Sequence, residues 1–340
     1  MIIVFCRKMK RLKNDLSLET CLKDDVARPI IQPCASSSGV TDYDWFSYLS
    51  AQQADEVNFW QPSGNTQFRA LHPGEPFLFK LHSPRNVIAG GGYFSHFSLS
   101  PLSFAWDAFQ EKNGAHSLSE MRERVWKYKK GQPQSVQEEV IGCILLQQPF
   151  FLREADWISV PDWPRSIVRG KGYDTDDQDG RRIWDQVQVR LTRPVPVPDE
   201  SVLVAAQKFG KPQIKLPRLG QGAFRMIVAD SYHRQCALSS SHILHILDAA
   251  HIRPYATEGG THSPTNGILL RQDIHTLFDR GYITVTPDYR VEVSKRIKEE
   301  FNNGVEYYAM HGKQIHLPRL EQLRPSRESL AWHNQTVFLK

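Results

Sequence analysis

Three short stretches near the C-terminus decide the fold of that part of the chain. Residues 247–254 read LDAAHIRP, residues 263–270 read SPTNGILL and residues 274–281 read IHTLFDRG. Apolar runs at residues 246–252 and 268–270 predict two strands, and the glycines of residues 258–260 predict a loop between them. A helix is expected to begin near Gln272 or Asp273. The sequence therefore predicts the order strand, loop, strand, helix.

The same stretches carry side chains suited to phosphodiester hydrolysis. His275 and Asp279 are four residues apart, so both lie on one face of the expected helix and can hold one divalent ion. Hydrolysis also needs a base that activates water, in addition to a cation that neutralises charge on the phosphate. We expect His251 to be this base and Asn266 to fix the loop through its side-chain hydrogen bonds. Mg²⁺ is the expected ion, with Mn²⁺ and Zn²⁺ as alternatives.

The pattern AAHI-x-P, NGI-x-L and H-x-L-F-D-x-G within residues 232–285 resembles the HNH (ββα-metal) endonuclease family, in the subgroup often attached to restriction systems. The resemblance implies three catalytic positions in this chain. His251 takes the place of the general base, Asn266 that of the loop-orienting residue, and His275 that of a metal ligand. It also implies a DNA endonuclease.

Two features depart from the family pattern. Many members have a metal-binding Asp or His directly before the base, whereas this chain has Ala250. We expect Asp279 to compensate, with Asp248, which has the strand parity of Ala250, as the second choice. The missing ligand leaves open an alternative, a non-catalytic nucleic-acid-binding protein on a degenerate HNH scaffold. The cysteines that flank many HNH sites are also absent, so Cys236 is expected to be a small buried residue.

The N-terminal part has a different pattern. Short strands are expected at residues 57–60, 76–81, 86–97, 140–146 and 187–191, with helices at 102–110 and 117–130. This part faintly resembles the PUA-like barrels that include EVE-type and SRA-type readers of modified bases, which receive a flipped nucleotide in an aromatic pocket. The resemblance implies that Trp60, Phe79, Tyr93 and Phe94 wall such a pocket, with Trp60 and Tyr93 as the candidate DNA contacts. The alternative is that these aromatic side chains belong to the core of the barrel.

A chain of 340 residues exceeds the usual size of a single core, so two domains are expected. The expected fold class is α+β, with an N-terminal PUA-like mixed β-barrel and a C-terminal HNH ββα-metal domain. Residues 1–39 are expected to be a disordered tail or to lie upstream of the natural start. Residues 40–192 are expected to form a PUA-like mixed β-barrel with helices that recognises DNA. Residues 193–220 are a proline-bearing connector, and residues 221–340 form the nuclease domain.

Charge and histidine are unevenly distributed. Residues 1–210 carry 25 basic and 25 acidic side chains, whereas residues 211–340 carry 17 and 12, and nine of the thirteen histidines also lie after residue 210. A basic part is consistent with a polyanionic partner such as DNA. Arg253 and Arg271 flank the expected site and are candidate phosphate contacts, with solvated surface arginines as the alternative. The remaining C-terminal histidines, His262 among them, are expected to be ordinary surface or core residues.

The five cysteines include no CxxC pair, which favours a reducing cytoplasm over an oxidising compartment. No segment approaches the roughly 20 apolar residues that a membrane span requires. A homodimer is possible. These observations together predict a metal-dependent restriction or defence nuclease whose N-terminal domain selects the target.

Overall fold

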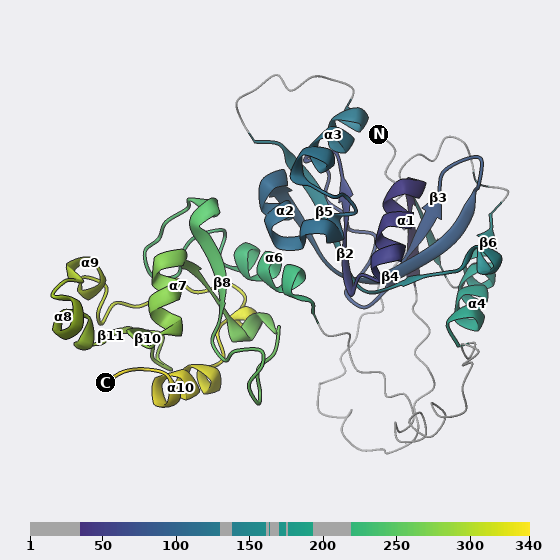
Figure 1. Cartoon of the computed structure of the whole chain (residues 1–340). Helices are drawn as coiled ribbons and strands as arrows, with labels where there is room; N and C mark the ends of the chain where they lie inside the picture. Colours follow the sequence, from purple (N-terminus) through teal and green to yellow (C-terminus); the bar gives the residue numbers. More distant parts are fainter. Residues whose placement is uncertain (1–34, 130–137, 161–162, 164–169, 175, 193–218) are drawn as a thin grey trace, which may run out of the picture. The chain divides into compact units, whose positions relative to one another are not determined.

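The computed structural model describes residues 35–129, 138–160, 163, 170–174, 176–192 and 219–340 (Figure 1). The contacts of the chain define two compact units, each built from segments that are distant in sequence. Unit 1 takes Met1–Tyr43, Glu75–Gly91 and Phe151–Pro212. Unit 2 takes Asp44–Gly74, Gly92–Phe150 and Gln213–Lys340.

In unit 1, strand β1 (Ala35–Thr41) lies between two partners. It pairs in parallel with β3 (Pro76–Leu81) and antiparallel with β7 (Gly170–Asp174). The strand order is β4-β3-β1-β7, and β6 (Ile158–Ser159) pairs antiparallel with the first residues of β4 (Val87–Pro101). Turn η2 (Glu154–Asp156) precedes β6. Strand β1 begins at Ala35, within the expected tail of residues 1–39. No strand was predicted there, because the sequence ASSSGVT lacks the apolar alternation that marks a strand. Residues 1–34 of the expected tail lie outside the described residues.

The strand predicted at residues 187–191 is wrong. These residues end helix α4 (Gln178–Thr192), in which Ile183, Trp184 and Val187 are buried on one face. Val189 and Leu191 are 51% and 40% exposed, so their alternation with polar residues does not reflect a half-buried strand. The longer helical period that begins at residue 178 overrides the short alternating pattern.

In the first part of unit 2, the structure confirms the strands predicted at residues 57–60 and 140–146 and the helices predicted at 102–110 and 117–130. Strand β2 (Glu56–Gln61) pairs antiparallel with β5 (Val140–Phe151), which adjoins the later residues of β4. The helices are α1 (Tyr43–Gln52), α2 (Leu102–Phe109), the short η1 (Gln110–Asn113) and α3 (Leu118–Lys129). Ser117 caps the start of helix α3, since Glu120 N donates to Ser117 Oγ at 3.2 Å, and the Glu120 side chain accepts from His116 N, one residue before the cap, at 2.8 Å.

The C-terminal part of unit 2 has the predicted strand–loop–strand–helix order. Helix α6 (Gln221–Ser231) precedes η4 (Leu244–Ile246), β8 (Leu247–His251), η5 (Pro264–Asn266), β9 (Gly267–Arg271) and α7 (Gln272–Asp279). Strands β8 and β9 pair antiparallel, and Figure 1 shows α7 beside β8. Gly281, at φ +76°, lets the chain turn after α7. The remaining elements are β10 (Ile283–Val285), β11 (Val291–Val293), α8 (Arg296–Phe301), α9 (Val305–Tyr308), η6 (Glu321–Leu323) and α10 (Arg327–Thr336).

One apolar core holds unit 2 together. It includes side chains of α2, α3, β5, α6, β8, β9, α7 and α10. His333 of α10 lies within it, 2% exposed, where it contacts Thr284 Oγ1 at 2.8 Å and stacks on Phe278 at 3.8 Å between ring centroids. The α+β fold class predicted from the sequence is confirmed. No helix in the described part of the chain is long and apolar enough to cross a membrane.

Candidate active site

The proposed base, His251, is the last residue of β8. Its register partner Gly267 opens β9, and a Cβ at Gly267 would lie 2.6 Å from Val228 and 2.9 Å from Phe224 of α6. Glycine in the NGI motif therefore lets α6 approach the strand pair closely. Through that approach the Phe224 ring stacks on His251, with 4.1 Å between centroids and 12° between planes.

The environment of His251 keeps its ring neutral. The pKa of His251 falls to about 4, because the ring is buried and because charges on His262 and His275 would repel its own. The negative charge of Asp248 opposes this shift without reversing it. An uncharged imidazole at neutral pH has a lone pair with which to accept a proton.

Asn266 joins the strand end to the loop before β9. Its side chain is 4% exposed; Oδ1 accepts from Arg253 N at 3.0 Å, and Nδ2 donates to Arg253 O and Thr261 O, each at 2.9 Å. The expected hydrogen bonds to the loop are thus present. Because these bonds are buried and backbone-directed, Asn266 fixes the chain on both sides of the site.

His275 lies between two carboxylates. Its Nδ1 is 3.2 Å from Asp248 Oδ2 and its Nε2 is 3.3 Å from Asp279 Oδ2, so residues of β8 and α7 form one row. Burial works against the charged form of His275, but the hydrogen bond with Asp248 and the charges of Asp279 and Asp248 together raise its pKa. Burial and the nearby Asp248 raise the pKa of Asp279. For Asp248, burial is outweighed by His275 and Arg225, and its pKa is lowered.

This row has the donor chemistry that a divalent cation needs, namely carboxylate oxygens and imidazole nitrogen. Within the described residues, no three His, Cys, Asp or Glu side chains converge as a metal-binding group. Both ring nitrogens of His275 already face carboxylates, so ligation through His275 requires one of these contacts to be exchanged for the ion. Ala250, at the position of the missing family ligand, is fully buried in the apolar core.

The two candidate phosphate-binding arginines have intramolecular partners. Arg253 contacts Glu328 Oε1 at 3.0 Å and lies over the Trp332 ring at 5.6 Å. Arg271 forms a two-pronged pair with Asp273 at 2.6 and 2.7 Å. Arg253 keeps an 85% exposed partner that DNA could displace, whereas Arg271 is held by a carboxylate that also accepts from a tyrosine.

The two candidate base-reading residues differ in their surroundings. Trp60 is half-buried; its Nε1 donates to Asn113 O at 3.0 Å, and its ring lies 6.4 Å from that of Tyr128. Tyr93 is also half-buried, and burial raises the pKa of its hydroxyl. In the described part of the chain, the Tyr93 hydroxyl makes no hydrogen bond. Trp60 is thus bonded to the backbone of unit 2 through its ring nitrogen.

Helix α6 contributes residues that the motif did not reveal. Besides Phe224 on His251, Arg225 Nε lies 3.6 Å from Asp248 Oδ1. The start of α6 is held by Glu56 of β2, which is 1% exposed and accepts from Gly222 N at 2.9 Å and Ala223 N at 3.0 Å. No local sequence signal links residue 56 to residue 222. In the sequence, only the adjacent Phe224 and Arg225, on a helix before the motif, indicated that α6 contributes to the site.

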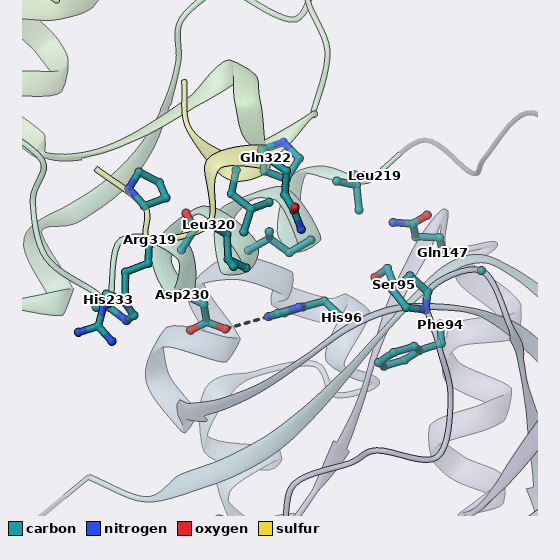
Figure 2. Close-up of a pocket in the computed structure, with 17 residues that line it drawn as sticks. Phe94, Ser95, His96, Gln147, Leu219, Asp230, His233, Arg319, Leu320 and Gln322 are labelled. Atoms are coloured by element: carbon teal, nitrogen blue, oxygen red, sulfur yellow. Dashed lines mark hydrogen bonds and ion pairs between the residues drawn. The ribbon is translucent and has the colours of Figure 1, made fainter. Parts of the chain in front are cut away.

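Unit 2 also contains a pocket of about 660 Å³ that does not include His251, Asn266 or His275 (Figure 2). Phe94 and His96 of β4 line it together with Asp230 of α6. His96 Nε2 lies 3.0 Å from Asp230 Oδ2, the dashed contact in Figure 2. This contact joins β4 to the last turn of α6, and the lining of the pocket also includes Leu219, just before the helix begins.

Comparison with known proteins assigns the C-terminal motif. Two solved structures show weak overall likeness: ASCH from Zymomonas mobilis (9% identity, 45% of this chain and 94% of that chain, TM-score 0.30) and a modification-dependent TagI restriction endonuclease (12% identity, 83% and 75%, TM-score 0.24). Likeness of this size does not define a fold or an activity. No curated protein sequence matches the chain. Residues 236–286 match the HNH endonuclease family model, so the chain carries an HNH endonuclease domain that spans His251, Asn266, His275 and Asp279.

Proposed function

We propose that this protein is a metal-dependent DNA endonuclease that hydrolyses phosphodiester bonds. The observation that carries the proposal is the arrangement of His251, Asn266 and His275 on β8, η5 and α7 within the segment that matches the HNH family. A neutral base, a locked loop and a carboxylate–imidazole row thus lie together in one ββα unit.

In this proposal His251 takes a proton from water as the water oxygen attacks the phosphorus. The leaving oxygen receives a proton from solvent. Asn266 keeps the end of β8 in place, because it holds both backbone groups of Arg253. Phe224 excludes water from one face of the His251 ring and restrains its orientation.

His275 and Asp279 are the proposed metal ligands, and Asp248 is a further candidate because it already contacts His275. HNH endonuclease domains in general use divalent ions, and we propose Mg²⁺ here, with Mn²⁺ and Zn²⁺ as the alternatives. When bound, the ion supplies positive charge to the scissile phosphate. Ligation favours the deprotonated carboxylate, and it would therefore reverse the raised pKa of Asp279.

The decisive experiment is plasmid cleavage by the full chain with Mg²⁺, Mn²⁺, Zn²⁺ or chelator. We expect ion-dependent nicking, and a loss of about 10²-fold or more in His251→Ala with DNA binding retained, as general-base catalysis contributes on that order. His242→Ala is the matched control, since His242 is exposed and lies outside the site. Cleavage by His251→Ala at the wild-type rate would remove His251 from the proposed role.

The second candidate function is non-catalytic nucleic-acid binding on the same scaffold. It is favoured by buried Ala250 at the ligand position and by the engagement of both His275 nitrogens. DNA binding without cleavage under every ion condition would support this candidate and contradict the first.

For target choice, we propose that the N-terminal part reads the DNA and that the protein serves in restriction of foreign DNA. HNH contacts fall mostly on backbone phosphates, which position a protein without specifying sequence. Tyr93 is the better candidate to stack on a base, because Trp60 is already bonded to Asn113. Tyr93→Ala should erase a preference between modified and unmodified duplexes, whereas Tyr93→Phe, which retains the ring, should keep it. A Tyr93→Ala variant that keeps the wild-type preference between modified and unmodified duplexes would exclude Tyr93 as the reader.

A further inference from the structure

A second histidine lies directly against the proposed base. His262 Nδ1 is 3.0 Å from His251 Nε2, and the two ring centroids are 5.1 Å apart with 57° between planes. His262 comes from the loop between the strands, 11 residues after His251, and belongs to none of the three motif positions. The contact of His262 with His251 therefore arises from the tertiary structure and not from the motif.

The pair is held from both sides. Phe224 stacks on His251, and Tyr255 stacks on His262 with 4.0 Å between centroids and 7° between planes. Asn266 fixes both segments that carry the histidines, because it bonds Arg253, two residues after His251, and Thr261, directly before His262. The contact between the two rings is thus built by several independent interactions.

Geometry at the two nitrogens of His251 distinguishes them. Nε2 faces His262, whereas Nδ1 has no hydrogen-bonding partner among the described residues. Two neutral rings share one proton in an N–H···N contact. If His262 is the donor, His251 Nε2 uses its lone pair for this bond and Nδ1 carries the proton, which leaves no free base. If His251 is the donor, its Nδ1 lone pair is free.

We propose that His262 is a positioning residue that accepts a hydrogen bond from His251 Nε2–H and so makes Nδ1 the basic nitrogen of His251. The catalytic consequence rests on the proposed function. In the reaction, an O–H bond of water breaks, its proton goes to His251 Nδ1, the water oxygen bonds to phosphorus, and the P–O bond to the leaving group breaks. His262 gains no proton but accepts from the resulting imidazolium, and such a charge-assisted bond is stronger than a neutral one.

The surrounding charges are consistent with an uncharged acceptor. Burial lowers the pKa of His262, and Lys112 also lowers it, whereas Glu56 and Asp55 oppose the shift. The charge of His275 also lowers the pKa of His251, whereas that of Asp248 raises it. A neutral His262 keeps the Nδ1 lone pair that the proposed bond requires.

The tautomer can be measured without DNA, metal or activity. Nitrogen-15 NMR of histidine rings in the metal-free full chain distinguishes a protonated Nε2 from a protonated Nδ1, and His251→Gln assigns the signals. We expect His251 to carry its proton on Nε2 in the wild type and to populate both tautomers in His262→Ala. A proton on Nδ1 in the wild type, or an unchanged tautomer in His262→Ala, would overturn the proposal.

Kinetics then tests the consequence with a matched pair of variants. The Asn Oδ1 can occupy the place of the imidazole Nδ1 as an acceptor but cannot titrate. We expect His262→Ala to lower kcat about 10- to 100-fold at unchanged KM for DNA, the range for loss of a group that orients a functional histidine, and His262→Asn to restore most of it. An Asn variant as slow as the Ala variant would refute positioning by acceptance. If the wild type does not cleave DNA, the proposed function fails while the NMR result still decides the tautomer.

Discussion

Replacing Glu56 tests whether strand β2 organises the nuclease site through helix α6. The Glu56 carboxylate is 1% exposed and accepts from Gly222 N and Ala223 N, and Lys112 Nζ lies 3.1 Å from it. Glu56→Gln keeps the shape and one good acceptor but turns an NH₂ group toward one of the backbone donors. A hydrogen bond to a charged group contributes about 1.5–3 kcal/mol, so we expect a loss of roughly 2–3 kcal/mol in the free energy of unfolding. Lys112 limits the loss, because Asp55 at 2.7 Å remains its partner.

The assay is urea unfolding followed by intrinsic fluorescence, together with plasmid cleavage. Asp55→Asn is the matched control: Asp55 also pairs with Lys112 but is 73% exposed, and loss of an exposed pair costs about 0–1 kcal/mol. We expect Glu56→Gln to lower both stability and cleavage, since a loosened α6 withdraws Phe224 from His251. Unfolding of Glu56→Gln within about 0.5 kcal/mol of the wild type, the scatter of ordinary surface changes, would refute the reasoning.

Two further predictions follow from buried polar groups. Asn266→Ala removes three buried hydrogen bonds to the backbone, each worth roughly 1 kcal/mol, and leaves backbone groups unpaired, so it should lower the free energy of unfolding by about 2–4 kcal/mol. We expect faster amide hydrogen exchange at Arg253. Unchanged exchange at Arg253 would show that other contacts hold the loop. Burial lowers the pKa of His333 from 6.5 to about 4, below its value in the unfolded chain, so its protonation favours unfolding. The contribution of neutral His333 to the free energy of unfolding is fully present above pH 6.5 and falls by up to about 3 kcal/mol as the pH drops toward 4. His333→Gln should therefore be less acid-sensitive than the wild type in denaturation measured from pH 7 to 4, and parallel curves would contradict this.

Local pattern was sufficient to predict the ββα unit. The apolar runs of β8 and β9 and the four-residue spacing of His275 and Asp279 predicted elements whose contacts are short in range along the chain. Asn266 was likewise predicted as a loop-fixing residue. Such a prediction was within reach of the sequence, because the side chain bonds a residue only 13 positions earlier. Periodicity failed at residues 187–191, where an exposed alternating run at the end of a helix imitates a strand.

The sequence by itself determined that His251, Asn266, His275 and Asp279, the candidate base, loop amide and metal-ligand pair, occur in HNH order. Only the tertiary structure decided what surrounds them. His262 meets His251 because a loop folds back across the strand end, and Glu56 holds α6 across 166 residues of chain. Such contacts leave no periodic trace, since neither partner's neighbours in sequence are constrained by the other. The orientation and protonation of the candidate base depend on these long-range contacts, because burial and hydrogen bonding act through space and not along the chain.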